Sequence, residues 1–488
     1  MSGYPFYDMR EFMEALEAAG ELVRVNTEVD WNLEASAIIR RTNEIGAPAP
    51  FFQKIKGYPE GFNRMMGGQM GGSAKGVYRR PAIAMGLDPD THESVIIDEF
   101  IRRMNNPIKP VIVKTGPCKE NILKGDDVDL TKFPAPMIHK GDGGRYICTW
   151  HAQIVKDPDS DWVNWGMYRL HILGKRTLAS QVEAFRHEGV MFYEKYEPRN
   201  KPMSVAIAIG PDPLCAIAAC TDAPAGVSEV DVAGGLRGAP VELVKCETSD
   251  LYVPASAEII IEGTVMPGER AEEGPHGEYT GYRVSERSDR ERLFVRVDCI
   301  THRNNPILAS SCMGMPVDDG HSAASLTQSA AILQEVRKKG IDVKGLYVPP
   351  YGPWASAIVA IKKKPYPAFI HELAAIIWST QCGRQVNYII FLEETANLYS
   401  PMEVLHEIIF RCHPIRGIRR LEQGPGSPLL PYLTAYERHY MFGVGAIIDC
   451  TAPMDWPFPP IESRFTNPTM YPQDLQDKIL GKWKEYGF

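Results

Sequence analysis

The chain has 488 residues, of which 44% are hydrophobic and 23% charged, and it carries a net charge of −8 at pH 7. A chain of this length can bury several hydrophobic cores, and its composition is that of a globular protein. The acidic balance argues against nucleic acid as the main partner, because a phosphate backbone requires clustered lysine and arginine.

Two further features of the sequence set its expected location. No apolar stretch approaches the roughly 20 residues that span a bilayer, and the first residues lack the organisation of a signal peptide. The 10 cysteines are scattered without CxxC spacing, which argues against a disulfide framework and a zinc site. We therefore expect a cytoplasmic protein with reduced thiols and no membrane span.

The chain opens with a helix signal. Asp8 is a capping residue, and Met9, Phe12, Met13 and Leu16 follow at helical spacing. Gly20 ends this helix, and "ELVRVN" reads as a strand. This alternation predicts an N-terminal α/β domain over residues 1–115.

The middle of the chain consists of short strand-like runs. "YICTWHAQIV", "MSVAIAIG", "AEIIIEG" and "LFVRVDCI" are separated by Pro, Gly and Asp turns, which favours a barrel or a strongly curved sheet over residues 116–310. Residues 311–488 then alternate helices near 321–339, 366–379 and 401–411 with strands. The predicted fold class is mixed α/β, with a C-terminal α/β domain.

The last helix carries an apolar stripe of Leu475, Ile479, Leu480 and Trp483. A helix with such a stripe needs a surface to cover it, and a second subunit is one candidate. We expect this tail to contribute to a homodimer or homohexamer.

The stretch "EEGPHGEYTGY" at residues 272–282 joins three carboxylates and an imidazole to turn glycines, directly after a buried strand. Glu273 and Glu278 either form a solvated loop edge or transfer protons. HExxH and GxSxG motifs are absent, which argues against a zinc protease and a serine hydrolase. An amide, an imidazole and a carboxylate at Asn164, His187 and Glu229 would suit Mn²⁺ or Mg²⁺, but the spacing alone does not show that they meet.

Several segments in register resemble one family. "NWGMYR", "GVSEVDVAGGLRG", "EEGPHGEYTGY" and "THRNNPIL" are similar to the UbiD family of decarboxylases that use prenylated FMN, among them the fungal cinnamic and ferulic acid decarboxylases and 4-hydroxy-3-polyprenylbenzoate decarboxylase. The resemblance runs from about residue 8 to the C-terminal helix. It implies that the central domain is split-barrel-like and binds the flavin.

The resemblance also implies roles for individual residues. Arg169, Glu273 and Glu278 match the family's catalytic network, with Arg169 pairing with Glu273 and Glu278 donating a proton after a covalent substrate–cofactor adduct loses CO₂. We expect His276 to be an ordinary loop side chain. Mn²⁺, or Mg²⁺, would bind Asn164, His187 and Glu229 and bridge to the flavin phosphate. A K⁺ site would comprise Trp165, Ala218, Ala219 and Thr221, although Ala219 replaces a common serine.

The remaining expectations concern the flavin and the substrate. The residues expected to bind the cofactor are Asn164, Trp165, Gly166, Met167, Tyr168, Arg169, Arg186, His187, Glu229 and Gln381. Gln381 stands where relatives have a phosphate-binding lysine, and Arg384 is a candidate replacement. Arg186 stands where relatives have glutamine, so it needs a partner, which is the flavin phosphate, the substrate, or a carboxylate such as Glu183 or Glu188. Arg186, Ala324 and Leu429 are expected to line the substrate pocket, with residues 426–432 as a mobile segment above it.

The function implied is reversible, non-oxidative decarboxylation of an aromatic, heteroaromatic or α,β-unsaturated carboxylic acid, and we favour a ring-bound carboxylate. A flavin prenyltransferase would supply the cofactor. Two alternatives remain open: an FMN oxidoreductase on the same fold, and a non-catalytic or carboxylase-complex subunit.

Overall fold

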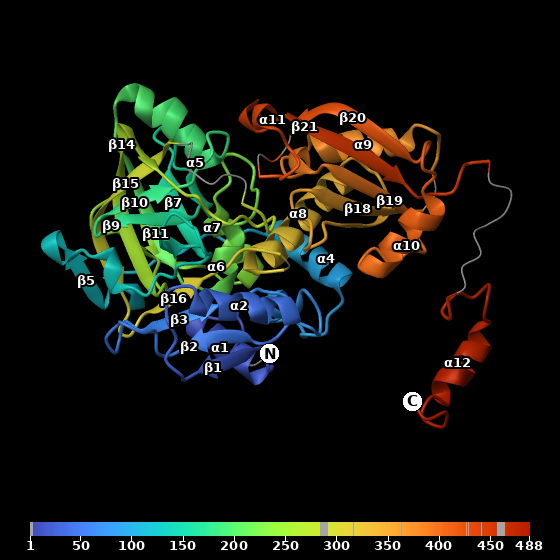
Figure 1. Cartoon of the computed structure of the whole chain (residues 1–488), viewed down its shortest axis with the longest axis horizontal. Helices are drawn as coiled ribbons and strands as arrows, with labels where there is room; N and C mark the ends of the chain where they lie inside the picture. Colours follow the sequence, from blue (N-terminus) through green and yellow to red (C-terminus); the bar gives the residue numbers. More distant parts are fainter. Residues whose placement is uncertain are drawn as a thin grey trace.

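The computed structural model describes residues 3–283, 291–315, 317–362, 364–425, 427, 429–440, 442–455 and 464–488. Within these ranges the chain is a mixed α/β protein built on several sheets, as predicted (Figure 1). None of the helices in this part of the chain is long and apolar enough to cross a membrane.

The N-terminal region is a small sheet covered by helices. Helix α1 (Met9–Ala18) begins at Asp8, whose side chain accepts a hydrogen bond from the Glu11 amide, and the four predicted apolar residues are buried. The other helices are α2 (Glu34–Ile45), α3 (Arg79–Ala84) and α4 (Glu93–Met104). The sheet order is β1 (Leu22–Val25), β2 (Ala49–Phe52), β3 (Arg64–Gly67) and β16 (Ile307–Ser310). Strand β16 is encoded far downstream and pairs in parallel with β3.

The central region is a large antiparallel sheet. Among the described residues it has nine strands in the order β6-β9-β10-β15-β14-β11-β7-β8, with β5 pairing to β15. Their bounds are β5 (Asn121–Lys124), β6 (Tyr146–Cys148), β7 (His151–Lys156), β8 (Val163–Gly166), β9 (Leu170–Gly174), β10 (Thr177–Ser180), β11 (Met203–Ile209), β14 (Ile259–Glu272) and β15 (Glu291–His302).

Strands β14 and β15 are adjacent, long strands in the interior of this sheet. Ile259, Ile260 and Ile261 are fully buried at the start of β14, and the register with β15 shifts at Glu262/Gly263 and again after Val265. Such bulges bend and twist a sheet. Strand β14 is buried at its start and mostly half-buried beyond Val265, and its last residue, Glu272, leads into the loop that begins at Glu273.

Short elements surround the central sheet. A three-stranded sheet has the order β13 (Tyr252–Pro254), β12 (Glu242–Lys245) and β4 (Val111–Ile112). The helices are α5 (His187–Val190), the π-helix η4 (Met191–Tyr196), α6 (Pro213–Ala218) and α7 (Glu229–Arg237). The 3₁₀ turns are η1 (Pro117–Lys119), η2 (Gly125–Asp127), η3 (Leu130–Lys132), η5 (Glu197–Arg199) and, further on, η6 (Gly383–Gln385).

The C-terminal region is a second α/β layer. Its sheet has the order β17 (Val343–Tyr347), β18 (Ser356–Ile361), β19 (Tyr388–Glu393), β21 (Phe442–Asp449) and β20 (Ile418–Pro425). The predicted helices are present as α8 (Asp319–Lys338), α9 (Phe369–Ser379) and α10 (Pro401–Arg411), and α11 (Ala435–Tyr440) is an addition. The buried helix α8 joins this layer to the rest of the molecule (Figure 1).

The terminal helix α12 (Gln473–Gly481) stands apart from the body of the chain (Figure 1). Leu475, Leu480 and Trp483, three residues of its predicted apolar stripe, are exposed. The helix is therefore present as predicted, but it does not bury its stripe on its own chain.

Candidate active site

The loop 273–283 brings both predicted catalytic glutamates onto one arginine. Glu273 follows β14, Glu278 lies further along the loop, and Arg169 lies between β8 and β9. Arg169 donates from Nε and Nη2 to the two carboxylate oxygens of Glu273 at 2.7 and 3.0 Å, and from Nη1 to Glu278 Oε1 at 2.8 Å. The planar guanidinium suits this arrangement because its donors match a carboxylate in pairs. The three residues form one connected charged group.

The two glutamates have different surroundings. Burial disfavours the charged form of Glu273, but the Arg169 guanidinium and the Tyr146 hydroxyl more than offset it and lower the pKa of Glu273 to about 2. The Tyr146 hydroxyl donates to Glu273 Oε1 at 2.6 Å. Glu278 receives one hydrogen bond from Arg169 and lines a cavity. Glu273 is therefore the fixed anion, and Glu278 is the carboxyl group that faces the open space.

The cavity is lined by residues of the central region and of the C-terminal region. It gathers most of the residues predicted from the sequence. These are Asn164, Trp165, Gly166, Met167, Tyr168, Arg169, Arg186, His187, Ala219, Thr221, Glu229, Glu278, Ala324, Gln381 and Leu429. Two of the predicted site residues, Glu273 and Ala218, do not belong to the described lining. Glu273 nevertheless contacts Arg169, which does belong to it.

Asn164, His187 and Glu229 share this cavity wall. Asn164 Nδ2 donates to Glu229 Oε1 at 3.0 Å, and the Trp165 amide donates to Glu229 Oε2 at 2.7 Å. Burial raises the pKa of Glu229 to about 8, and the buried Asn164 Oδ1 has no hydrogen-bond partner among the residues that the structure describes. A divalent cation would satisfy both the buried carboxylate and the orphaned amide oxygen. The residues present therefore fit the metal that the resemblance implies.

Comparison with known proteins identifies the chain. Three consecutive family models match it: the N-terminal domain of 3-octaprenyl-4-hydroxybenzoate carboxy-lyase over residues 13–100, its Rift-related domain over 109–316, and its C-terminal domain over 321–450. The chain belongs to the UbiD family. It is a carboxy-lyase of that family, and the UbiD resemblance seen in the sequence is confirmed.

Two curated UbiD relatives match the whole length of the chain. Pyrrole-2-carboxylic acid decarboxylase of Pseudomonas aeruginosa is 31% identical, with 99% of this chain and 98% of the relative covered. Ferulic acid decarboxylase 1 of Saccharomyces cerevisiae is 28% identical, with 99% of each covered. Both relatives are decarboxylases, and neither is more than about a third identical to this chain.

A solved UbiD-class structure has the same fold. The enzyme HmfF of Pelotomaculum thermopropionicum in complex with FMN superimposes with a TM-score of 0.82 at 29% identity, covering 94% of this chain and 98% of that chain. An evolved dimeric form of that enzyme in complex with prenylated FMN gives a TM-score of 0.77 at 28% identity, over 93% and 97% of the two chains. The UbiD-class fold is therefore established for this protein.

The residues expected to hold K⁺ are only partly in the cavity wall. Trp165, Ala219 and Thr221 line it, whereas the Ala218 carbonyl already accepts hydrogen bonds from the Thr221 amide at 2.9 Å and from the Thr221 hydroxyl at 2.6 Å. Ala219 offers only its backbone oxygen. A K⁺ ion at this turn stays a prediction.

Arg186 has a partner, but not one of the two glutamates considered from the sequence. Its Nη1 donates to Asp222 Oδ1 at 3.0 Å. Glu183 instead accepts from Arg292 at 3.2 Å, and Glu188 accepts from Gln153 at 2.6 Å. Glu188 is fully buried in α5. Asp222 lines the same wall as Arg186, which places their charges together.

The C-terminal region contributes Gln381 but not Arg384. Gln381 and Gln385 belong to the cavity lining, whereas the described lining does not include Arg384, which is exposed. In the segment 426–432, Leu429 lines the cavity, and Gly426 and Pro428 lie outside the described residues.

Several cavity residues were not found from the sequence. Tyr279 directly follows Glu278, and its ring packs edge-on against Trp354 with centroids 4.7 Å apart. The Tyr279 hydroxyl lies 3.3 Å from the Ser427 hydroxyl. Tyr279 belongs to the same motif as the two glutamates and could have been predicted as a site residue. Trp354 lies in the connection between β17 and β18, where no sequence motif indicates a site. His276 is in a loop, as expected, but it is buried with only 4% of its surface exposed.

Proposed function

We propose that the protein catalyses the reversible, non-oxidative decarboxylation of an aromatic or heteroaromatic monocarboxylic acid with prenylated FMN as cofactor. The observation that carries the proposal is the Arg169–Glu273–Glu278 group at the wall of a cavity that also gathers Asn164, His187 and Glu229. The decarboxylases and the FMN and prenylated-FMN complexes among its UbiD relatives support it.

Part of the cavity wall is suited to the cofactor phosphate. Asn164, His187 and Glu229 would hold a divalent metal there, with Mn²⁺ or Mg²⁺ as the expected ion, and the metal would neutralise a phosphate that is otherwise costly to bury. When bound, the prenylated flavin would supply the electron-accepting centre that makes loss of CO₂ from the substrate feasible.

A second part of the wall is suited to proton transfer. Glu273 receives two donors of Arg169 and the Tyr146 hydroxyl, so it stays ionised and is a poor acid. Glu278 has one hydrogen bond to Arg169 and reaches the cavity. When the bond to the carboxylate breaks and CO₂ leaves, Glu278 would pass its proton to that carbon and regain one from solvent. In the carboxylation direction Glu278 would accept the proton.

The lining favours a substrate with a single acidic group. Both arginines of the described lining, Arg169 and Arg186, are already paired with carboxylates of the chain. Neither is left to neutralise a second carboxylate on the substrate, which would be costly to bury unpaired. The aromatic rings of Tyr279 and Trp354 and the small side chain of Ala324 leave a wall suited to a flat ring. We therefore favour a ring-bound monocarboxylate over a cinnamate.

The decisive experiment is a substrate screen of loaded enzyme. The protein is coexpressed with a flavin prenyltransferase, purified without oxygen, and assayed with benzoates, hydroxybenzoates, pyrrole and furan carboxylates and cinnamates for CO₂ release and for deuterium exchange at the ring carbon. We expect turnover that depends on the prenyltransferase and is highest with ring carboxylates. Oxidation of NAD(P)H with ordinary FMN and no decarboxylation would favour the oxidoreductase alternative, and flavin binding without either activity would favour a non-catalytic subunit.

A further inference from the structure

A second loop, residues 139–145, is hydrogen-bonded to the loop 273–283 at several points. The Gly143 amide donates to the Pro275 carbonyl at 2.7 Å, and the Gly277 amide donates to Asp142 Oδ1 at 3.0 Å. Arg283 Nη2 donates to the Lys140 carbonyl at 2.6 Å. The fit is close, because a Cβ on Gly143 would lie 2.0 Å from the Gly274 carbonyl oxygen. Loop 139–145 therefore lies alongside the backbone that carries both glutamates.

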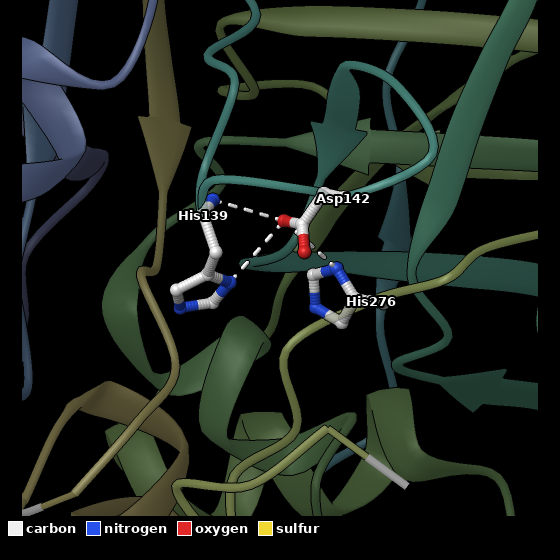
Figure 2. Close-up of side chains that lie close together, drawn as sticks. All are labelled: His139, Asp142 and His276. Atoms are coloured by element: carbon white, nitrogen blue, oxygen red, sulfur yellow. Dashed lines mark hydrogen bonds and ion pairs between the residues drawn. The ribbon is translucent and has the colours of Figure 1, made fainter. Parts of the chain in front are cut away.

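Asp142 is the centre of this contact (Figure 2). While its Oδ1 holds the amide next to Glu278, its Oδ2 accepts from the His139 amide at 3.0 Å and faces His139 Nδ1 at 3.2 Å. His276 Nδ1 lies 3.5 Å from the same oxygen. The Asp142 side chain is fully buried, and its contacts with His139 and His276 outweigh burial and keep its pKa well below the usual range. The carboxylate is thus a fixed, ionised acceptor.

The trio His139, Asp142 and His276 could also be considered as metal ligands, since their ligand atoms lie within 4.8 Å of one another. Two observations count against a metal. Both Asp142 oxygens already accept backbone N–H groups. His139 Nε2 lies 2.7 Å from the Met313 carbonyl, to which it can only donate, while Nδ1 faces the carboxylate. Both ring nitrogens of His139 are therefore already engaged with oxygen atoms of the protein.

The buried ring of His276 has a separate contact. It packs against Tyr146 with centroids 4.4 Å apart, and the Tyr146 hydroxyl donates to Glu273. Neither ring nitrogen of His276 has a hydrogen-bond partner of good geometry among the described residues. The closest contact of the His276 ring is therefore its packing on Tyr146, which a phenylalanine ring could also make, while its Nδ1 lies 3.5 Å from Asp142 Oδ2.

We propose that Asp142 is a positioning residue for the proton donor: by holding the Gly277 amide it fixes the adjacent Glu278 on Arg169 and toward the cavity. Asp142 itself is outside the described cavity lining and so acts through the loop. The role of Glu278 as donor rests on the proposed function, whereas the anchoring of the loop by Asp142 does not.

The test compares Asp142→Asn, His276→Phe and a matched control, Asp129→Asn. An asparagine cannot replace Asp142, because whichever way its amide turns, an NH₂ group faces an N–H group that the carboxylate had accepted. His276→Phe keeps the ring against Tyr146. Asp129 also accepts a backbone amide, that of Thr131 at 2.9 Å, but in a turn outside the described lining.

The readouts separate positioning from folding and from the proposed function. In Asp142→Asn we expect faster hydrogen–deuterium exchange in peptides covering 273–283, unchanged flavin content, KM within a few-fold, and kcat lower by roughly 100-fold, the scale of a misplaced catalytic group. His276→Phe and Asp129→Asn should keep kcat within a few-fold. If the wild type proves inactive, the proposed function fails, and the exchange measurement still decides whether Asp142 anchors the loop.

Three results would overturn the proposal. The first is unchanged exchange in 273–283 in Asp142→Asn. The second is a loss of activity fully explained by lower flavin content or by KM. The third is a second equivalent of transition metal per chain, present in the wild type and lost from both Asp142→Asn and His276→Phe, which would make the trio a metal site.

Discussion

Arg186 donates a hydrogen bond of 3.0 Å to Asp222, and both residues face the cavity. The other carboxylate oxygen of Asp222 accepts from the Cys382 thiol at 3.1 Å. Because Cys382 belongs to the C-terminal region, Asp222 connects the two regions that form the cavity walls. The positive charge of Arg186 is thereby paired with a carboxylate of the protein.

This pairing predicts the effect of Arg186→Gln. The substitution leaves the charge of the Asp222 carboxylate unpaired beside the substrate. Because this charge repels an anionic acid, we expect KM to rise about 10-fold, which corresponds to about 1.4 kcal/mol of binding free energy. The double variant Arg186→Gln/Asp222→Asn should recover most of the loss, because it removes the unpaired charge. KM values over the substrate panel check this. An unchanged ranking and unchanged KM in the single variant would show that Arg186 has no part in substrate choice.

The proton donor is tested by Glu278→Gln. Glutamine keeps the shape and can still accept from Arg169, but it carries no acidic proton, so kcat should fall by roughly 100-fold or more. Flavin content should match the wild type. Solvent-deuterium incorporation into the product is the measurement. Near-normal incorporation would assign the proton to another group, and Glu273→Gln is the comparison that would identify it.

The metal assignment is tested by His187→Ala. We expect the purified variant to hold less divalent metal and less flavin, since the ion would link His187 to the cofactor phosphate. Metal analysis and flavin absorbance provide both readouts without an activity assay. His413→Ala, an exposed histidine outside the described lining, is the control. Full retention of metal and flavin in His187→Ala contradicts the assignment.

Acid stability should depend on Glu273. Its pKa is lowered from 4.5 to about 2 in the folded chain, so its ionised form stabilises the fold above pH 4.5, and that stability is lost as the pH falls toward 2. Glu273→Gln should therefore have a lower Tm than the wild type at pH 7, and the difference should shrink as the pH falls through this window. Glu17→Gln removes an exposed ion pair and should show little difference at any pH. A Tm difference between Glu273→Gln and the wild type that does not change with pH would show that ionised Glu273 does not stabilise the fold.

The tail helix α12 should be needed for assembly. Its exposed Leu475, Leu480 and Trp483 would be unusual on a monomer, and α10 also exposes Met402, Ile409 and Phe410. We predict that the chain forms a homodimer or homohexamer and that removal of residues 473–488 lowers its mass in light scattering. Substitution of the neighbouring charged residue Lys478 by alanine should not. An unchanged mass after truncation would place the interface elsewhere.

Local signals in the sequence account for the elements that could be predicted. Helix α1 follows from Asp8 and the apolar residues behind it, and α9 and α10 follow from their apolar periodicity. The pairing of β16 with β3 could not be predicted, because the strands are some 240 residues apart and neither sequence indicates which strand it will pair with.

The site divides in the same way. The acidic loop was visible from the sequence, but the contact of Glu273 and Glu278 with Arg169 depends on a turn between β8 and β9 more than 100 residues upstream, and only the family resemblance connected them. Asp222 was missed as the partner of Arg186 because sequence proximity favoured Glu183 and Glu188. Such ion pairs are decided by tertiary packing, which brings Asp222, in the connection between α6 and α7, against Arg186.

The position of β16 also affects how the protein can be made. Strands β1 to β3 leave the ribosome early, but their sheet gains its fourth strand only after residue 310 has been synthesised. Until then β3 presents an unpaired edge, the kind of surface at which nascent chains associate wrongly. We therefore expect a fragment or chimera of the amino-terminal region to fold correctly only if it keeps residues 307–310.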